Sequence, residues 1–377
     1  MVQIGSLLLK ETESGQEKGV ALLNSSSPWA SDLQDLTKLF DSPSTSAVTT
    51  RTAVVSSEDI ERLRREAKSA AFKSVYEQDA NVHSHAFVRD HLKTLEGGRL
   101  TIARGSINSY GFSPHPLSSY LDWLSQLFSS SERKPVIISI TGPPEAVGGT
   151  IAYLRDWTSE ILGGTADEGW SNLIGVEVNL SCPNVKGTDM PTAYDPEAIA
   201  QYLKEIKAAN EGSRGHLLSV GLKLPPYSYH AQFAALVQEL SSLGSLKDAG
   251  RHPIAFLTST NTLGCSFWLN EGDSPGRFTP SLPRGLPGDD QGFDGTGGLA
   301  GESLHPISLG NVYRLRRLLD ASGDKRLKNI DIIGVGGVIS GLAAQRMHAA
   351  GAKAVALATA LGREGVDCFD RISDEIL

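Results

Sequence analysis

Short runs of strand-forming residues alternate with helical patterns along most of this sequence, and this alternation constrains the fold more than any other feature. The runs are Ser46–Thr50, Ile102–Ile107, Val136–Thr141, Ile174–Leu180, Leu218–Leu224, Ile254–Ser259, Ile330–Val335 and Ala354–Ala358. Several are continuously apolar or β-branched, which is typical of strands buried on both faces. Between most of them we expect helices, at Leu117–Phe128, Pro144–Leu162, Pro196–Asn210, Tyr229–Leu240, Leu309–Ala321 and Gly341–Ala350, with a last helix near Glu364–Ile376.

Eight strands that alternate with helices predict an α/β protein, and specifically a (β/α)8 or TIM barrel. A doubly wound open sheet has the same alternation, and a count of strands does not show closure. The 377 residues are enough for one large barrel or for two domains. Because no internal repeat or linker divides the chain, we expect residues 1–377 to form a single barrel domain.

Two connections are longer than a minimal barrel needs. We expect an inserted helical segment around 53–100, after the first strand, and an elaborated loop at Gly264–Gly301, after the sixth. Ser56 and Asp59 have capping-box spacing, and a stripe of apolar residues follows at helical spacing: Ile60, Leu63, Ala67, Ala71 and Val75. The insertion leaves from the active-site end of a barrel strand, so we expect a cover or a subunit interface. A surface elaboration beside the barrel mouth is the alternative.

Charge and cysteine content exclude several classes of protein. The net charge of −8 argues against nucleic acid or an anionic membrane as a partner, since both require a basic surface. No run approaches the roughly 20 apolar residues of a membrane span. The three widely spaced cysteines, Cys182, Cys265 and Cys368, predict a reducing compartment without a disulfide framework. We therefore expect a soluble, cytoplasmic protein.

Glycine-rich or small-residue turns follow the last two predicted strands. Gly334–Gly337 follows the seventh strand, and Ala358–Leu361 follows the eighth. In barrels these two loops form the usual phosphate site, and glycine lets the backbone approach an anion closely. Two tight strand-to-helix turns without a ligand are the alternative interpretation. The position of both loops favours a phosphate site and is the main reason for preferring the barrel.

Polar side chains gather where other predicted strands end, which is where barrel enzymes place their catalytic residues. Asn179, Cys182 and Asn184 follow one another at the end of the fourth strand, Asn108 ends the second, and Asn261 follows the sixth. Amide donors and acceptors suit a neutral heterocycle with amide edges. The cysteine is a candidate nucleophile or base, and an inert packed thiol is the alternative.

Two further features concern charge and metal binding. Lys223 lies inside the fifth predicted strand, where a side chain that faces the barrel centre requires an anionic partner. An outward side chain that reaches solvent is the alternative. His83 and His85 form an H-x-H pair, but no further metal-binding residue stands near them at suitable spacing. We therefore expect no metal site.

Five segments together resemble the dihydroorotate dehydrogenases. They are Asn179–Val185 (NLSCPNV), Gly221–Tyr227 (GLKLPPY), Ile332–Gly337 (IIGVGG), Ser106–Gly111 (SINSYG) and Gly365–Ile372 (GVDCFDRI), and the match runs in order from about Leu22 to Ile376. A cysteine at the position of Cys182 is similar to the soluble class 1 enzymes, whereas the membrane-bound class 2 enzymes have a serine there.

The resemblance implies a barrel that binds FMN and oxidises dihydroorotate to orotate in pyrimidine synthesis. Cys182 would take the proton from C5 while a hydride leaves C6 for flavin N5. The substrate contacts it implies are Arg51, Asn108, Tyr110, Gly111, Phe112, Asn179, Asn184, Asn261 and Thr262. The implied cofactor contacts are Ser26, Ser27, Arg51, Thr52, Asn108, Asn179, Lys223, Thr258, Gly301, Gly336, Gly337, Ala358 and Thr359. The most similar members have one subunit type, use fumarate as electron acceptor and form homodimers.

This sequence departs from the family pattern at three places. Arg51 stands where the family has lysine, Tyr110-Gly111-Phe112 replaces a Met-Gly-Leu, and Ala358 replaces a glycine of the phosphate loop. Arginine keeps the positive charge but presents a planar fork instead of a compact ammonium group. Two alternatives therefore stay open: a related FMN oxidoreductase for another dihydropyrimidine or enone, and a flavin-binding barrel without catalysis.

Overall fold

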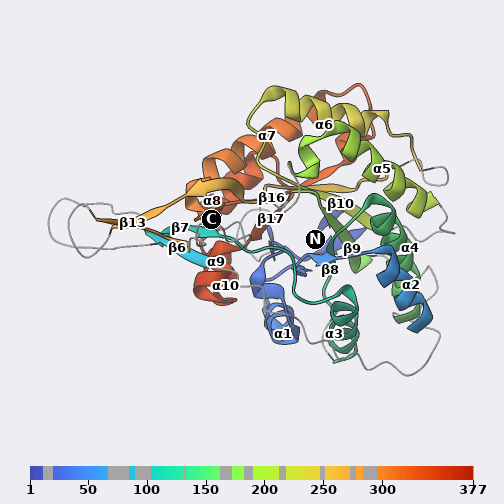
Figure 1. Ribbon diagram of the computed structural model, residues 1–377, viewed down its shortest axis with the longest axis horizontal. Helices are drawn as coiled ribbons and strands as arrows, with labels where there is room; N and C mark the ends of the chain where they lie inside the picture. Colours follow the sequence, from blue (N-terminus) through green and yellow to red (C-terminus); the bar gives the residue numbers. More distant parts are fainter. Residues whose placement is uncertain are drawn as a thin grey trace, which may run out of the picture.

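The centre of the molecule is a parallel β-barrel surrounded by helices (Figure 1). The computed structural model describes residues 1–11, 20–66, 85–89, 103–130, 133–161, 172–181, 190–211, 218–246, 251–271, 277–282 and 295–376. The barrel strands are β3 (Ala21–Asn24), β4 (Val48–Thr49), β8 (Val136–Thr141), β9 (Ile174–Asn179), β10 (Ser219–Leu224), β11 (Phe256–Ser259), β16 (Asp331–Val335) and β17 (Ala354–Leu357). The short strand β5 (Ala53–Val54) also pairs with β8. A bridge between Leu23 and Ala47 joins the first barrel strand to the segment before the second and completes the circle.

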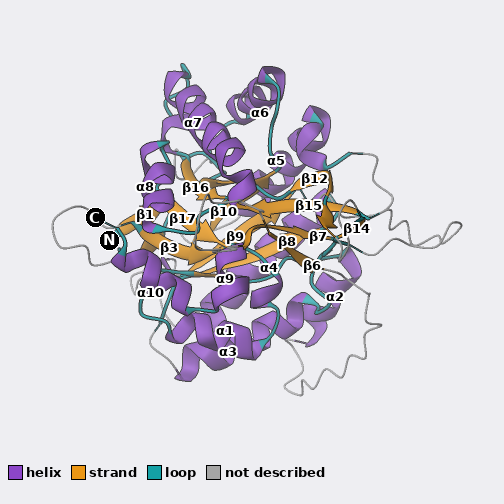
Figure 2. Ribbon diagram, turned by 90° about the vertical axis from the view of Figure 1, so that its left-hand side faces the viewer, coloured by secondary structure: helices purple, strands orange, loops and turns teal. Residues whose placement is uncertain are grey.

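Helices pack around the outside of the barrel, as Figure 2 shows. They are α1 (Leu33–Asp41), α2 (Ser57–Glu66), α3 (Leu117–Ser130), α4 (Pro144–Ile161), α5 (Pro196–Glu211), α6 (His230–Ser242), α7 (His305–Ala321), α8 (Gly341–Ala349), α9 (Thr359–Glu364) and α10 (Asp367–Asp374). Each helix predicted from the sequence forms within a few residues of its predicted ends. The (β/α)8 barrel is therefore confirmed, and the open doubly wound sheet is excluded.

The assignment of the first two barrel strands was wrong. The first barrel strand is Ala21–Asn24, which carries no alternating pattern and is only four residues long. Ser46–Thr50 contributes the second strand instead of the first. The run at 102–107 does form a strand, β7 (Ala103–Asn108), but this strand lies outside the barrel. The long insertion therefore follows the second barrel strand.

The two long connections build a separate antiparallel sheet. Strand β7 pairs with β6 (His85–Arg89) on one side and with β15 (Thr296–Gly301) on the other, and β15 also pairs with β12 (Leu263–Phe267). A hairpin of β13 (Leu269–Glu271) and β14 (Phe278–Pro280) forms a second, two-stranded sheet after β12. Figure 1 shows β6, β7 and β13 away from the barrel axis. His85 begins β6, whereas His83 lies outside the described residues.

The beginning of the insertion packs against the barrel helices. Helix α2 starts with a Ser56 cap at the predicted position, since the Asp59 backbone N–H donates to Ser56 Oγ (3.1 Å). Ser56 Oγ in turn donates to Asp59 Oδ2 (2.7 Å), a contact between side chains. Buried Ile60 lies against α4, where Gly149 leaves room for it. The stripe beyond α2 lies outside the described residues, so its role as a cover or interface stays a prediction.

One end of the barrel is filled by apolar side chains. A hairpin of β1 (Val2–Ile4) and β2 (Leu7–Leu9) covers the amino ends of the barrel strands, and its Ser6 backbone N–H donates to Ser219 Oγ at the start of β10 (2.6 Å). Its side chains pack with Phe256 in the barrel interior. Gly221 is required beside them, since a Cβ there would collide with the Phe256 ring. The cavity described below opens at the opposite end, where the strands finish.

Candidate active site

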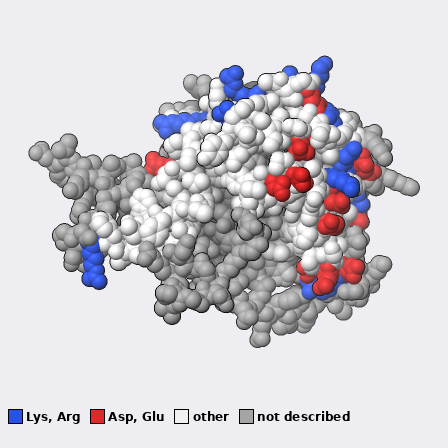
Figure 3. Space-filling view, turned by 45° about the horizontal axis from the view of Figure 1, so that its top comes forward, with Lys and Arg blue, Asp and Glu red and all other residues white. Residues whose placement is uncertain are grey.

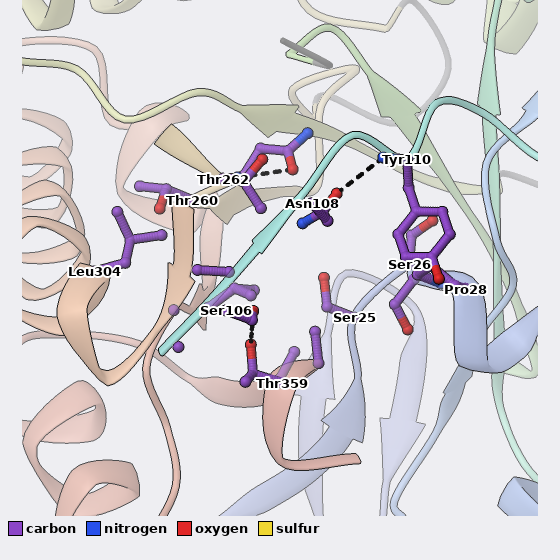
Figure 4. Close-up of a pocket in the computed structure, with 18 of the residues that line it drawn as sticks. Ser25, Ser26, Pro28, Ser106, Asn108, Tyr110, Thr260, Thr262, Leu304 and Thr359 are labelled. Atoms are coloured by element: carbon purple, nitrogen blue, oxygen red, sulfur yellow. Dashed lines mark hydrogen bonds between the residues drawn. The ribbon is translucent and has the colours of Figure 1, made fainter. Parts of the chain in front are cut away.

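A cavity opens at the carboxyl ends of the barrel strands, between the barrel and the antiparallel sheet (Figure 4). Most of the side chains singled out from the sequence line it, although they come from distant parts of the chain. They are Ser26, Ser27, Arg51, Thr52, Asn108, Tyr110, Gly111, Phe112, Asn179, Lys223, Asn261, Thr262, Gly301, Gly336, Gly337, Ala358 and Thr359. Their individual roles stay predictions.

Three predicted site residues are not placed on the cavity wall. Cys182 and Asn184 lie outside the described residues. Thr258 is buried and does not line the cavity, and its hydroxyl has no hydrogen-bond partner among the described residues. Sequence reasoning also missed several lining residues: Ser25, Pro28, Trp29, Ser106, Thr260, Ala300, Leu304, Val335, Val338, Ile339 and Ala356. Ser25, Pro28 and Trp29 follow β3, the strand that the sequence pattern did not indicate.

Arg51 forms one wall of the cavity as a fixed planar cation. Its side chain is buried, with Nη1 donating to Ser31 Oγ (3.1 Å) and Nη2 donating to the Gly111 carbonyl (3.3 Å). The guanidinium carbon lies 5.6 Å from the centre of the Tyr110 ring, which is within cation–π range. Two of the residues that depart from the family pattern, Arg51 and Tyr110, therefore contact each other.

A histidine near this wall is disfavoured as a cation. Burial lowers the pKa of His115, and the positive charge of Arg51 lowers it further, against the opposing effect of Asp32. His115 also packs edge-on against Trp123. The charge at this wall is therefore that of Arg51.

The amides at the ends of β9 and β11 are linked through one serine. Asn179 Oδ1 accepts hydrogen bonds from the backbone N–H (3.1 Å) and the hydroxyl (3.0 Å) of Ser181. Asn261 Nδ2 donates to the same Ser181 hydroxyl at 3.0 Å. On the sheet side, Asn108 Oδ1 accepts from the Tyr110 backbone N–H at 3.2 Å (Figure 4). The amides are thus held in defined orientations.

Lys223 points into the barrel and is only 3% exposed. The outward alternative is therefore wrong. Its ammonium group donates to Ser25 Oγ (3.2 Å) and to the Ser26 carbonyl (3.3 Å), and both acceptors are neutral. A buried ammonium group held only by neutral acceptors favours an anionic ligand. Among the described residues that line the cavity, Arg51 and Lys223 are cationic and none is acidic.

The turns predicted to bind phosphate form the far end of the cavity. Gly336 and Gly337 have φ values of +123° and +69°, which other residues rarely adopt. His305 Nδ1 donates to the Gly336 carbonyl at 2.8 Å and fixes this turn. Thr359, at the start of α9, lies 3.1 Å from the Ser106 hydroxyl of the antiparallel sheet (Figure 4). The turns from β16 and β17 therefore line the same cavity.

The described part of the chain shows neither a metal-binding cluster nor a membrane-spanning helix. It holds no group of three or more His, Cys, Asp or Glu side chains placed to bind a metal. None of its helices is both long and apolar enough to cross a membrane. The face in Figure 3 carries basic and acidic side chains side by side among the residues that it colours.

Comparisons with known proteins agree with the fold and the motifs. The family model for dihydroorotate dehydrogenase matches residues 99–377. A probable dihydroorotate dehydrogenase A (fumarate) of Streptococcus pneumoniae serotype 4 is 30% identical over 275 residues, which cover 72% of each chain. A dihydroorotate dehydrogenase (fumarate) of Trypanosoma cruzi is 33% identical over 273 residues, again 72% of each chain.

A solved structure supports the same fold. The crystal structure of a dihydroorotate dehydrogenase from Eimeria tenella, in complex with ferulenol, superposes with a TM-score of 0.55 at 16% identity. The match covers 94% of this chain and 80% of that one. Together with the family match over most of the sequence, these findings confirm the resemblance: the chain belongs to the dihydroorotate dehydrogenase family.

Proposed function

We propose that this protein oxidises dihydroorotate to orotate with bound FMN and passes the electrons to fumarate. The observation that carries the proposal is the composition of one cavity, in which oriented amides stand beside two buried cations and no described acid. Amides suit the pyrimidine ring, and the cations suit a carboxylate and an anionic cofactor. The names of the relatives, which include fumarate, support the substrate and the acceptor.

The residues present fit FMN. Lys223 has only neutral hydrogen-bond partners, and the buried Ser27 hydroxyl on the cavity wall has none in the described structure. Gly336, Gly337, Ala358 and Thr359 would hold the phosphate, since the substitution by alanine at 358 keeps the backbone N–H. Lys223 would lie at the ring and stabilise negative charge on its reduced form.

Within this site the protein's own groups would bind, orient and deprotonate the substrate. Asn108, Asn179, Asn184 and Asn261 would hold the pyrimidine by its amide edges, and Cys182 would remove the proton at C5. Bound FMN supplies the acceptor for the hydride that leaves C6. A cysteine base has an unperturbed pKa of about 8.5, so we expect flavin reduction to quicken as the pH rises through that region.

Anaerobic stopped-flow reduction tests this role. Cys182→Ala should keep FMN bound but slow flavin reduction by dihydroorotate by orders of magnitude, because the proton loses its acceptor. Cys265→Ala is the matched control, since Cys265 is an exposed free cysteine that does not line the cavity. An unchanged reduction rate in Cys182→Ala would remove Cys182 from the mechanism.

The contact between Arg51 and Tyr110 favours one second candidate, a relative with another substrate. Parallel reduction with dihydroorotate, dihydrouracil and dihydrothymine separates the two, because only dihydroorotate carries a carboxylate for the guanidinium group. A yellow protein that none of them bleaches would instead be a flavin-binding barrel without catalysis. Reoxidation with fumarate, NAD and a quinone identifies the acceptor.

The proposals for cellular compartment and oligomeric state follow from the resemblance to the soluble class 1 enzymes. We propose that it acts in the cytoplasm as a homodimer. Light scattering of the purified holoprotein tests the dimer, and fractionation of cells tests the compartment.

A further inference from the structure

A buried carboxylate is connected to the cavity by a chain of hydroxyl groups. Glu177, only 2% exposed, lies on β9 two residues before Asn179. Its Oε1 accepts a hydrogen bond from Ser139 Oγ at 3.0 Å. Ser139 Oγ lies 2.9 Å from Thr52 Oγ1, which lies 2.9 Å from Ser26 Oγ on the cavity wall. The function proposed above gives Glu177 no role.

The carboxylate fixes the direction of every hydrogen bond in this chain. An ionised carboxylate only accepts, whereas each hydroxyl has one proton to donate. Ser139 gives its proton to Glu177, so Thr52 must give its own to Ser139. Ser26 must then donate to Thr52, and the Ser26 oxygen is left with only lone pairs for the cavity.

The opposite end of the network is compatible with this direction. The Ser181 backbone N–H can only donate, so the atom that faces it on Asn179 is the oxygen. Asn179 Nδ2 therefore faces Thr52 and donates to its hydroxyl at 3.0 Å. With the hydrogen bond from Ser26, Thr52 accepts two hydrogen bonds, and its single proton points to Ser139, on the side of Glu177.

We propose that Glu177 is a positioning residue, which acts through Ser139 and Thr52 to hold Ser26 as a hydrogen-bond acceptor at the cavity wall and Asn179 in its orientation. The inference rests on the proposed function, because the ligand concerned is FMN. The Ser26 oxygen, which can only accept a hydrogen bond from the cavity, suits a ligand ring that offers an N–H. The isoalloxazine ring of FMN offers such an N–H at its imide edge. If the carboxylate is replaced by an amide, the chain can reverse, and Ser26 can then present a proton instead.

The test measures FMN dissociation from the holoprotein, by diluting it and following the fluorescence of released FMN. Ser139→Ala removes the hydroxyl that links Glu177 to Thr52 but keeps the Glu177 carboxylate. Glu177→Gln keeps the shape of the side chain but replaces a group that only accepts hydrogen bonds with an amide that can also donate. We expect each to weaken FMN binding about tenfold, the effect of about one hydrogen bond. Ser139→Thr, which keeps the hydroxyl, should restore binding. Ser219→Ala is the control, because Ser219 is a buried serine at the closed end of the barrel.

The pattern of FMN binding across these variants either supports or overturns the role of Glu177. Weakening in both variants with rescue by Ser139→Thr supports the positioning role. A change in Glu177→Gln alone overturns it in favour of a charge that acts through space, and FMN binding like that of the Ser219→Ala control in both variants overturns it outright. If Ser139→Ala fails to fold, the FMN affinities of Glu177→Gln and Ser139→Thr still test the role of Glu177. A wild-type protein that holds no FMN would overturn the proposed function itself.

Discussion

At the scale of single residues, strand-end reasoning found much of the cavity. Asn179, Lys223 and Asn261 could be predicted together because the carboxyl ends of parallel strands meet at one end of a barrel. Glu177 and Ser139 could not, because their contact depends on the register of β8 against β9, which places the two residues side by side. A sequence shows which side chains can accept or donate, but not which of them face each other.

Arg51 gives a prediction about substrate affinity. Arg51→Lys keeps the charge but loses the planar fork that contacts Ser31 and Gly111, and it weakens the stacking on Tyr110. We expect the KM for dihydroorotate to rise about tenfold with kcat changed less than about twofold. Steady-state kinetics check this, with Arg155→Lys as the control, because Arg155 does not line the cavity. A KM within twofold of the wild-type value would show that a compact ammonium group serves equally well.

His252 gives a prediction about pH. Its ring is buried, Nε2 donates to the Leu240 carbonyl (2.9 Å), and Nδ1 accepts from the Ile254 backbone N–H (3.0 Å). Burial lowers the pKa of His252 in the folded state. The unfolded chain therefore binds the proton more readily than the folded one. Neutral His252 thus contributes to the free energy of unfolding above the unfolded-state pKa of about 6.5, and this contribution is lost as the pH falls below that value.

Urea unfolding at pH 7.5 and pH 5.5 checks this sign. The wild-type protein should lose more unfolding free energy between the two pH values than His252→Gln, which cannot be protonated. Equal losses in the two proteins would show that His252 does not contribute to the pH dependence.

At the scale of elements, helices were more predictable than strands. A helix such as α2 shows its start in the cap formed by Ser56 and Asp59 and its buried face in its periodicity. A strand buried on both faces shows only an apolar run, and this signal is the same inside a barrel and in an antiparallel sheet. β7 was therefore found as a strand but assigned to the wrong sheet.

The packing of α2 on α4 gives a stability prediction. Ile60→Ala removes a buried side chain that fills the space above Gly149 and should lower the unfolding free energy by about 2–4 kcal/mol. Glu61→Ala, on the exposed face of the same helix, should change it by less than about 0.5 kcal/mol. Chemical denaturation of both variants checks the difference. Equal effects would mean that the insertion does not pack on the barrel through this face.

At the scale of the whole molecule, the predicted count of eight barrel strands was correct because two errors cancelled. β3 was missed and β7 was added. Closure itself depends on the pairing of segments that a local pattern cannot connect, such as Ala354–Leu357 with Ala21–Asn24. What the sequence did indicate was the polarity of the barrel, since its glycines, amides and lysine mark one end of the strands.

The amino-terminal hairpin gives the prediction at this scale, because it closes the opposite end of the barrel. Leu7 is 0% exposed and packs against Gly175 inside the barrel, whereas its neighbour Leu8 is 38% exposed. Leu7→Ala should lower the unfolding free energy by about 2–5 kcal/mol, and Leu8→Ala by less than about 0.5 kcal/mol. FMN affinity should stay unchanged in both, since the cavity opens at the other end. Denaturation and FMN release measured on the same samples check both statements. A Leu7→Ala protein of normal stability would show that the hairpin does not fill the barrel, and one that loses FMN while folded would show that the two ends are coupled.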